Sequence, residues 1–303
     1  MNTEKQLTRD CVVKPQFSLA ELTTFRVGGP AEWFVAPRTL ADLQAGLAWA
    51  SAEGLNVMIL GAGSNLLISD QGLPGLVICT RYLRESVLDP STGRVTAAAG
   101  EPMATLAWKA AKHGLTGLEW TVGIPGTVGG AVVMNAGAHG CDTEHILVET
   151  TVVDPDGSLE TLPPEALAYK YRTSVLQRDG RVVTHATFQL QPGGDPQKIK
   201  AATAADLQQR RDTQPYHLPS CGSVFRNPAP HSAGWLIEQS GLKGFQIGQA
   251  QIAERHANFI LNCGGAKAAD IFRLIRHAQE TVEAKWALHL KPEVRILGEF
   301  RQA

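Results

Sequence analysis

An excess of charge of either sign is absent from this 303-residue chain, whose 28 Lys+Arg and 29 Asp+Glu give a formal net charge of -1. Proteins that bind nucleic acid usually carry a basic face, so we expect no nucleic-acid partner. Apolar runs of membrane-spanning length, about 20 residues, are absent too. Residues 1–9 are polar and lack the apolar core of a signal peptide. These absences predict a cytoplasmic protein with no membrane partner, and we expect it to be a monomer.

Paired cysteines are also missing. The five cysteines are an odd number and lie far apart, without Cys-x-x-Cys spacing. This pattern disfavours both a disulfide framework and a zinc site. The nine histidines include no His-Glu-x-x-His motif, so we expect no metal.

Glycine and other small residues are concentrated in the segment Gly123-Ile124-Pro125-Gly126-Thr127-Val128-Gly129-Gly130-Ala131, continued by Asn135-Ala136-Gly137. Glycine permits positive φ and close backbone approach, and successive N–H groups in a turn form a concave anion site. The segment is therefore expected to lie, with uncovered N–H groups, against a large anionic ligand. The alternative is a tight turn where two elements pack closely.

An earlier small-residue run, Gly61-Ala62-Gly63-Ser64-Asn65-Leu66, directly follows an apolar stretch at 57–60 that reads as a buried strand. In chain order this is the first glycine run, and the segment that begins at Gly123 is the second. A loop at a strand end is a favoured phosphate site, because its N–H groups are unpaired. Two such loops suggest a pyrophosphate held from two sides. No Lys-Ser/Thr follows the glycines, and the first run lacks a third glycine and a helix start. Neither a P-loop nor a dinucleotide fingerprint is therefore present.

The order of the predicted elements divides the chain into three ranges: 1–84, 85–195 and 196–303. After a polar tail and an extended segment at 22–35, the first range has a helix from 40 to near 54, with Thr39 as N-cap, and a strand at 76–79. The second has strands at 94–99, 145–153 and 181–190 and a helix at 102–113. A linker at 191–196 precedes the third range. That range has helices near 197–211, 233–240 and 269–287 and strands at 257–262 and 293–300, with Trp235 and Phe259 expected in the core.

Further motifs accompany the two glycine runs in a fixed order between residues 18 and 299: Thr24-Phe25-Arg26-Val27-Gly28-Gly29-Pro30-Ala31, Tyr171-Arg172-Thr173-Ser174, Cys221-Gly222-Ser223-Val224-Phe225 and Pro292-Glu293-Val294-Arg295. The set resembles the UDP-N-acetylenolpyruvoylglucosamine reductase (MurB) family of peptidoglycan synthesis. The interval between Arg172 and Ser223 holds no inserted lid, which is similar to the shorter, second class of the family. Tyr216 is therefore not assigned the lid-tyrosine role.

The resemblance implies an α+β fold. The first two ranges would be the lobes of an FAD-binding domain of the vanillyl-alcohol-oxidase (PCMH) type, and the third a C-terminal α+β substrate-binding domain. Non-covalent FAD would lie against Gly61, Ala62, Gly63, Ser64, Asn65, Leu66, Gly123, Ile124, Pro125, Gly126, Thr127, Gly129, Gly130, Asn135, Ala136 and Gly137. The implied reaction is NADPH-dependent, ping-pong reduction of UDP-N-acetylenolpyruvoylglucosamine to UDP-N-acetylmuramate.

Hydride addition to the enolpyruvyl group leaves an anion that must be stabilised and protonated. The resemblance makes Ser223 the proton donor and gives Arg172 and Glu293 the stabilising role. Each has an ordinary alternative: a turn serine, a surface ion pair worth at most ~1 kcal/mol, and a solvated carboxylate at a strand end. Because serine is a weak acid, we expect a hydrogen-bond partner for Ser223.

Donors for the two phosphates and the carboxylate of the substrate are expected mainly in the third range. By resemblance the substrate contacts are Tyr171, Gln214, Arg226, Asn227, Lys243, His256 and Asn258. His256 has the alternative of a structural histidine, and Tyr171 would allow Arg172 to stack on its ring. Two other functions stay open at this point: a related FAD-dependent alcohol oxidase, and a nucleotide-binding regulator without catalysis.

Overall fold

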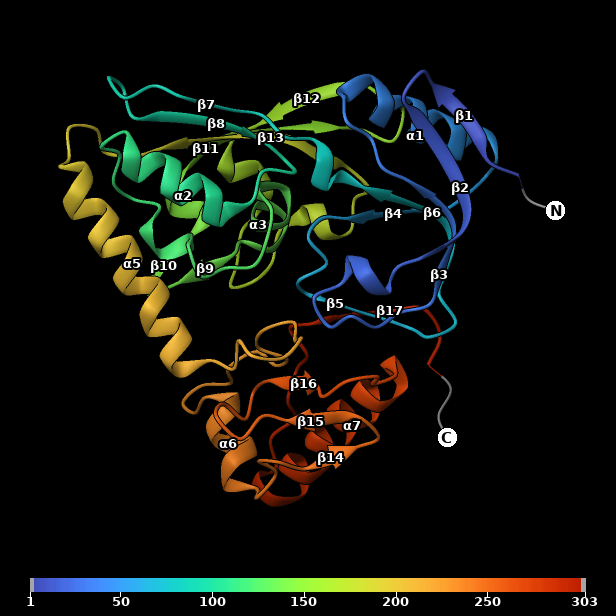
Figure 1. The fold of residues 1–303 in the computed structure, drawn as a ribbon, viewed down its shortest axis with the longest axis vertical. Coiled ribbons are helices and arrows are strands. Elements are labelled where there is room, and N and C mark those ends of the chain that lie inside the picture. Colours follow the sequence, from blue (N-terminus) through green and yellow to red (C-terminus); the bar gives the residue numbers. More distant parts are fainter. Residues whose placement is uncertain (1–2, 301–303) are drawn as a thin grey trace. The chain divides into compact units, whose positions relative to one another are not determined.

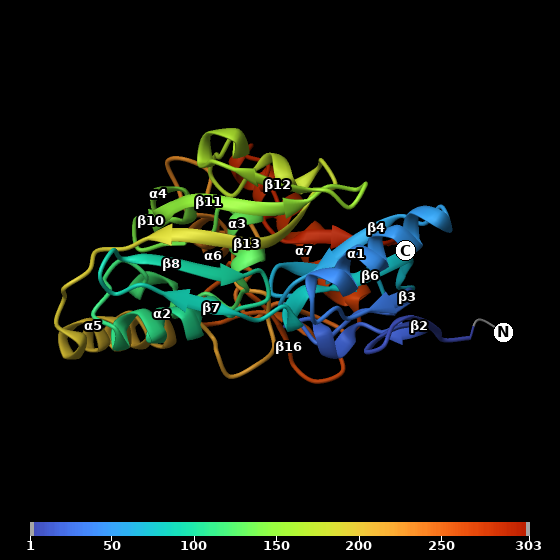
Figure 2. The same cartoon turned by 90° about the horizontal axis from the view of Figure 1, so that it is seen from above.

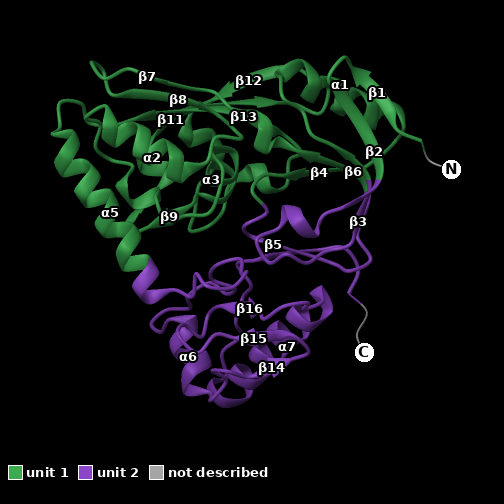
Figure 3. Ribbon diagram, viewed as in Figure 1, with its two compact units in different colours: residues 1–15, 33–62, 75–210 green, residues 16–32, 63–74, 211–303 purple. Residues whose placement is uncertain are grey.

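Two compact units make up the computed structural model, which describes residues 3–300. Unit 1 comprises residues 1–15, 33–62 and 75–210, and unit 2 comprises 16–32, 63–74 and 211–303 (Figure 3). Both units are therefore built from separate stretches of the chain. The sequence predicts that ranges 1–84 and 85–195 bind FAD and that range 196–303 binds the substrate. That division stays a prediction.

The N-terminal sheet has the strand order β1-β2-β3-β6-β4. Its strands are β1 Lys5–Thr8, β2 Cys11–Ser18, β3 Pro30–Val35, β6 Leu73–Cys79 and β4 Val57–Leu60. The expectation of a polar tail is wrong for residues 5–8, because β1 pairs antiparallel with β2. An edge strand keeps polar side chains in water, so its sequence has no apolar signal. The predicted strand at 57–60 is present and lies parallel to β6, but the expectation that it is buried holds only for Leu60, since Val57 is exposed.

Helix α1, Leu40–Ala52, begins where its sequence predicts. The Asp42 N–H donates to Thr39 Oγ1 at 3.1 Å, and the Thr39 N–H donates to Asp42 Oδ2 at 3.1 Å. This reciprocal capping box satisfies two N–H groups that the first turn leaves without helical partners. Leu43 and Leu47 then pack into a core shared with the N-terminal sheet.

A second sheet in unit 1 is wholly antiparallel, in the order β12-β11-β13-β8-β7 (Figure 2). Its strands are β7 Ser86–Leu88, β8 Arg94–Ala98, β11 Leu147–Val153, β12 Leu159–Leu162 and β13 Val182–Gln189. The predicted strand at 145–153 starts late, because the Asp142 side chain caps a short helix, α4 Thr143–Ile146. The hairpin β9 Gly137–Ala138 and β10 Cys141–Asp142 precedes it.

Helices α2, Met103–Lys112, and α3, Val128–Met134, share one apolar core with this sheet and lie on the same side of it (Figure 1). The helix predicted at 102–113 is confirmed. The loop expected throughout 123–137 is wrong for residues 128–134. Two glycines lower the helix propensity of this stretch, but Thr127 caps it and Val128, Ala131 and Val132 are buried.

Unit 2 joins an early segment to the C-terminal part of the chain. Strand β5, Leu66–Ile68, pairs parallel with β17, Arg295–Leu297, and Asp70 accepts the N–H groups of Ala268 and Ala269 at 2.8 and 2.9 Å. The sheet β14-β15-β16 and two helices complete the unit. These elements are β14 Gln246–Ile247, β15 Ala250–Ile252, β16 Ile260–Asn262, α6 Ala233–Gln239 and α7 Ala268–Trp286.

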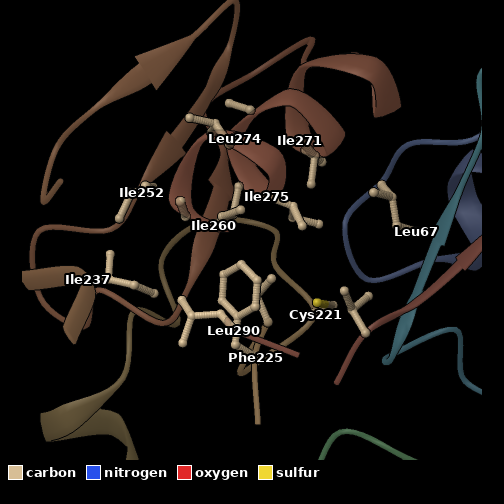
Figure 4. Close-up of a cluster of buried hydrophobic side chains, with 14 of the residues drawn as sticks. Leu67, Cys221, Phe225, Ile237, Ile252, Ile260, Ile271, Leu274, Ile275 and Leu290 are labelled. Atoms are coloured by element: carbon tan, nitrogen blue, oxygen red, sulfur yellow. The ribbon is translucent and has the colours of Figure 1, made fainter. Parts of the chain in front are cut away.

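The core of unit 2 draws on all of these segments. Figure 4 shows Leu67 from β5 beside the core side chains of the C-terminal part, among them Phe225 and Ile271. Phe259 is buried as predicted, with 4% of its surface exposed, whereas Trp235 is 39% exposed. The prediction for Trp235 is wrong because it lies on the outer face of α6 and stacks on His231, with ring centroids 4.5 Å apart.

Several other predictions differ only at element ends. Helix α5, Pro196–Thr213, is present where expected. The strand predicted at 257–262 shrinks to β16, since the Phe259 N–H turns back to the His256 carbonyl. Short 3-10 helices fill connections at Ala20–Leu22, Thr80–Tyr82, Glu119–Thr121, Pro164–Leu167 and Val175–Gln177. Within residues 3–300 no helix has the length and apolar character needed to cross a membrane.

Candidate functional site

The two glycine runs meet in unit 1. Gly61 follows the end of β4, and Thr127 is the N-cap of α3. A Cβ added to Gly61 would lie 2.8 Å from Thr127 Oγ1, closer than real Cβ atoms approach. Glycine at position 61 therefore lets the Thr127 hydroxyl lie directly against the backbone at the end of β4.

The N–H groups of the second run are mostly used within the protein. Val128 N–H donates to the Glu101 carbonyl and Gly129 N–H to the Ala99 carbonyl, both at 2.9 Å. A Cβ on Gly129 would lie 2.9 Å from Ala99 Cβ. The expectation of uncovered N–H groups is wrong at these two residues, and Gly129 serves the close packing that was the alternative.

The start of the second run lies under a basic side chain. A Cβ on Gly123 would collide with Cδ of Arg210, which belongs to α5 and to unit 1. The next residues form a tight turn, in which Ile124 N–H donates to the Thr121 carbonyl and Gly126 N–H to that of Ile124. Gly123 thus allows an arginine to lie directly on the backbone.

The second half of the first run belongs to unit 2 and is tied to the Pro292-Arg295 motif. Gly63 has φ +68, and a Cβ there would collide with the Leu22 carbonyl. Asn65 Nδ2 donates to the Glu293 carbonyl at 3.2 Å, while the Asn65 carbonyl accepts the Arg295 N–H at 3.0 Å. Two motifs far apart in sequence are therefore one structural element.

Arg172 lies at the end of the second run in unit 1. Its Nη2 donates to the Gly137 carbonyl at 2.7 Å and its Nη1 to the Asn135 carbonyl at 3.4 Å. Its guanidinium lies 5.0 Å from the centre of the Tyr171 ring, so the predicted stacking is confirmed. Arg172 also has φ +57, a conformation that costs free energy for a side chain of this size. These bonds distinguish it from a simple surface ion pair.

Asn135 joins α3 to the turn that carries Arg172. It is 2% exposed, its Oδ1 accepts the Glu144 N–H at 3.0 Å, and its Nδ2 donates to the Lys170 carbonyl at 3.4 Å. Among the residues assigned to the cofactor, Asn135 therefore also has a structural task. Ala136 continues the turn through an N–H bond to the Ala131 carbonyl.

Ser223 and Glu293 are brought together by their backbones in unit 2. The Val224 carbonyl accepts the Glu293 N–H at 2.8 Å, and Phe225 and Pro292 form an antiparallel bridge. Burial raises the pKa of the Cys221 thiol, and the nearby charge of Glu293 raises it further. The expected hydrogen-bond partner of the Ser223 hydroxyl is not found among residues 3–300.

Three of the predicted substrate contacts in unit 2 already make side-chain interactions within the protein. Lys243 Nζ pairs with Glu238 Oε1 at 2.8 Å, and Asn227 Oδ1 accepts the Ala233 N–H at 3.0 Å. Asn258 bonds the backbone of Phe225 with both ends of its amide.

The remaining predicted contacts differ in burial and in their backbone bonds. Burial lowers the pKa of the half-buried His256, and the Gln214 carbonyl accepts the Tyr216 N–H. Arg226 N–H donates to the Lys291 carbonyl. Tyr171, in unit 1, is 54% exposed. Their roles toward substrate stay predictions.

Comparison with known proteins decides the family. Residues 214–297 match the family described as UDP-N-acetylenolpyruvoylglucosamine reductase, C-terminal domain, and residues 31–163 match an FAD binding domain. The reductase of Acaryochloris marina is 59% identical over 293 residues, covering 97% of this chain and 95% of its own. This chain belongs to the UDP-N-acetylenolpyruvoylglucosamine reductase family.

Other members of this reductase family agree over the same length. The Trichormus variabilis reductase is 61% identical over 294 residues, covering 97% of this chain and 89% of its own. The crystal structure of the Thermus caldophilus reductase has a TM-score of 0.79 and 35% identity, covering 94% of this chain and 98% of that one. The expected fold class, an FAD-binding domain of the PCMH type followed by a C-terminal α+β domain, is confirmed.

A more distant likeness concerns the fold alone. The crystal structure of 6-hydroxy-D-nicotine oxidase from Arthrobacter nicotinovorans has a TM-score of 0.50 and 19% identity, and it covers 62% of this chain and 43% of its own. The reductase family thus shares part of its fold with an oxidase, and so the fold by itself does not decide the reaction.

The residues of this reductase fit an FAD cofactor at the meeting of the glycine runs. The space beside Gly61 and Thr127 is one that a single Cβ would fill, and bare backbone of this kind accepts close contact with phosphate groups. No group of three or more His, Cys, Asp or Glu within residues 3–300 has an arrangement suited to a metal ion.

Two basic residues of this reductase were absent from the predicted site. Arg295 is half-buried, which lowers its pKa, and it follows Glu293 by two positions, with the buried Val294 between them. This alternation was visible in the sequence and places Arg295 and Glu293 on the same side of the chain. Arg210, which lies on Gly123, gave no sequence signal, since its position on α5 is one of several basic positions there.

Proposed function

We propose that this enzyme uses NADPH to reduce the enolpyruvyl group of UDP-N-acetylenolpyruvoylglucosamine, giving UDP-N-acetylmuramate for peptidoglycan. The observation that carries the proposal is the likeness to curated reductases over 97% of the chain, at 59% identity. The backbone junction of Ser223 and Glu293 at Val224 supports it, because both residues belong to the motifs that the oxidase reading leaves unexplained.

Cofactor binding would fall to the two glycine runs. When bound, FAD supplies hydride transfer from NADPH to the enolpyruvyl carbon. Gly61, Gly123, Gly126 and Gly130 would let the backbone approach the cofactor, together with the neighbouring residues of both runs. Thr127 would hold the start of α3 in place beneath them.

Proton delivery and charge stabilisation would fall to three side chains. A hydride added to one carbon of the double bond leaves an enolate, which must be stabilised by donors and protonated at the other carbon. Ser223 would give its hydroxyl proton to that carbon and regain one from water. Arg172 offers a planar fork of donors suited to a carboxylate or enolate oxygen, and Glu293 would donate a hydrogen bond to the enol oxygen in its protonated form.

Recognition of the anionic substrate would use polar groups of unit 2. Gln214, Arg226, Asn227, Lys243 and His256 are the proposed contacts, with Tyr171 from unit 1. Lys243 would have to exchange its ion pair with Glu238 for a phosphate. We further propose that the enzyme works as a cytoplasmic monomer without a nucleic-acid partner, and that NADPH leaves before the sugar nucleotide enters.

The experiment is an anaerobic visible spectrum of the purified protein during addition of NADPH and then of the enolpyruvyl sugar nucleotide. We expect a yellow protein that bleaches with NADPH and regains its colour with the sugar nucleotide. Recovery of colour only on admission of air would favour an alcohol-oxidase-like activity. A colourless protein that FAD does not reconstitute would overturn the proposal.

The role of Ser223 has its own test. In Ser223→Ala, flavin binding and reduction by NADPH should stay intact, while reoxidation by substrate slows by about 10²–10⁴-fold, the usual contribution of general acid catalysis. Ser220→Ala is the matched control and should react as the wild type does. Normal reoxidation in Ser223→Ala would remove the serine from the mechanism.

A further inference from the structure

The loop that carries Ser223 has little to hold its active side chain directly. The preceding Gly222 has φ +81 and open space around it, and the Ser223 hydroxyl makes no hydrogen bond within residues 3–300. The backbone therefore sets the position of the Ser223 Cβ, and the hydroxyl can move only by rotation about the Cα–Cβ bond. The bonds that fix residues 224 and 225 therefore decide where the Ser223 proton is delivered.

Asn258 makes most of those bonds on one side of the loop. The Phe225 N–H donates to Asn258 Oδ1 at 2.9 Å, and Asn258 Nδ2 donates to the Phe225 carbonyl at 2.8 Å. The Asn258 backbone carbonyl also accepts the Val224 N–H at 2.9 Å. The side-chain amide thus takes the place of a peptide group in a neighbouring strand, with a donor and an acceptor in matching positions.

The other side of the loop is held by the segment that contains Glu293. Val224 carbonyl accepts the N–H groups of Glu293 and Val294, at 2.8 and 3.3 Å, and Arg226 N–H donates to the Lys291 carbonyl at 2.9 Å. The loop after Ser223 is therefore clamped between Asn258 and the Glu293 segment. Loss of either clamp would move Ser223 relative to Glu293.

Asn258 itself has little freedom. It is 3% exposed, and its N–H donates to His256 Nδ1 at 3.3 Å within a turn closed by the bond from Phe259 N–H to the His256 carbonyl. Its amide is already bonded at both ends to Phe225, so it has less capacity left for a substrate group than the exposed Asn227 does. This arrangement favours a positioning role over the substrate contact that the resemblance implied.

We propose that Asn258 is a positioning residue for proton transfer: its side-chain amide acts as a surrogate peptide that holds the backbone after Ser223 and so aims the serine hydroxyl. The inference rests on the proposed role of Ser223. It predicts an effect on the rate of reoxidation by the enolpyruvyl substrate. Flavin reduction and substrate affinity should be unaffected.

The test uses Asn258→Asp, which keeps the shape and the acceptor but loses the donor to the Phe225 carbonyl. Stopped-flow measurement should give normal flavin reduction by NADPH, an unchanged KM for the sugar nucleotide, and reoxidation slowed by about 10²-fold, as expected for a misplacement of about 1 Å. Asn258→Ser, which is smaller and introduces no carboxylate, is the second variant if the first is poorly folded.

Asn262→Asp is the matched control. Asn262 is also buried, at 6% exposure. Its Nδ2 donates to a phenylalanine carbonyl, that of Phe25, at 2.9 Å, and its Oδ1 accepts the backbone N–H groups of Gly264 and Ala266. If Asn258 has only a structural role, both variants should lower the melting temperature, and the folded variants should be reoxidised at the same rate as each other. Only the positioning role predicts slow reoxidation in Asn258→Asp alone.

A double-mutant cycle separates this inference from the proposed function. On a Ser223→Ala background the additional effect of Asn258→Asp should disappear, since no serine hydroxyl is left to aim. If Ser223→Ala slows reoxidation and Asn258→Asp does not, the positioning role is wrong and the proposed function stands. If Ser223→Ala has no effect, both fail. A raised KM in Asn258→Asp would make Asn258 a substrate contact and overturn the inference.

Discussion

The glycine runs of unit 1 and the Ser223 loop of unit 2 prepare the molecule for chemistry by opposite means. Around Gly61 and Thr127 the important feature is a missing side chain, because a single added Cβ would fill the space between the Gly61 backbone and the Thr127 hydroxyl. Around Ser223 the important feature is a side chain that is present and aimed by backbone bonds on both sides. A binding surface thus needs side chains to be absent, whereas a reacting group needs one side chain held in a defined position.

Each region nevertheless contains one buried asparagine with a similar task. Asn135 is 2% exposed and joins α3 to the turn of Arg172, and Asn258 is 3% exposed and holds the loop of Ser223. The two ends of the Asn135 amide bond the backbones of Glu144 and Lys170, and both ends of the Asn258 amide bond the backbone of Phe225. The two regions therefore share a buried asparagine that bonds backbone groups. They differ in that one relies on glycine and the other on serine.

The largest effect should come from filling the space at the meeting of the glycine runs. Gly61→Val would place a branched side chain where even a Cβ lies 2.8 Å from Thr127 Oγ1, and we expect loss of bound flavin and hence of all activity. The flavin-to-protein absorbance ratio after purification and FAD reconstitution measures this. Gly46→Ala, where the nearest atom to an added Cβ is 3.5 Å away, is the control and should keep its flavin. Full flavin occupancy in Gly61→Val would place the cofactor elsewhere.

A smaller effect should follow from removal of the asparagine in the glycine region. Asn135→Ala leaves the Glu144 N–H and the Lys170 carbonyl without the partner that they have in the wild type. We expect a loss of about 1–3 kcal/mol in the free energy of unfolding, the usual cost of unsatisfied buried polar groups. Urea unfolding measures it, and an unchanged midpoint would show that the contact between α3 and the Arg172 turn has no energetic importance.

The smallest effect concerns pH and the histidine behind Asn258. Burial, and to a lesser extent the charge of Lys243, lower the pKa of His256 below its ordinary value of 6.5, whereas a backbone hydrogen bond of His256 and the charge of Glu238 act in the opposite direction. As the pH falls below 6.5, the unfolded chain takes up this proton before the folded one does, so His256 makes the free energy of unfolding decrease. Above 6.5 this contribution is constant.

The measurement for His256 is the difference in free energy of unfolding between the wild type and His256→Gln across this pH range. As the solution becomes more acidic, the wild type should lose free energy of unfolding relative to His256→Gln, because glutamine takes up no proton. A difference that does not vary with pH would mean that His256 titrates alike in both states. The exposed His145, whose pKa the Asp142 side chain raises, is expected to act in the opposite sense and weakly.

Local signals in the sequence predicted the periodic elements well. The capping residues Thr39 and Asp42 fixed the start of α1, and the apolar spacing within 269–287 predicted α7, which spans Ala268–Trp286. The order of short motifs indicated the family and with it the fold. These features depend on neighbours in sequence or on a pattern shared along the chain, so no knowledge of packing was needed.

Features that depend on contacts between distant segments could not be predicted. The polar strand β1 is a strand only because β2 pairs with it, and α3 forms despite Gly129 and Gly130 because its apolar residues are buried against a sheet. Within the candidate site, nothing in the motif Cys221 to Phe225 indicated that Asn258 would hold it. Trp235 was expected in the core from its residue type, which does not say which face of the seven-residue helix α6 packs inward.

The way unit 2 is assembled has a consequence for the biosynthesis of the chain. Its core includes Phe25 and Leu67 together with Phe225 and Ile271, so early residues leave the ribosome long before their partners are made. Residues 16–32 and 63–74 must wait until the last hundred or so residues have emerged. A fragment that begins at residue 211 would lack β5 and the core side chains of Phe25, Val27 and Leu67, and we expect it to be captured by chaperones or degraded. The folding of this unit is therefore tied to completion of synthesis.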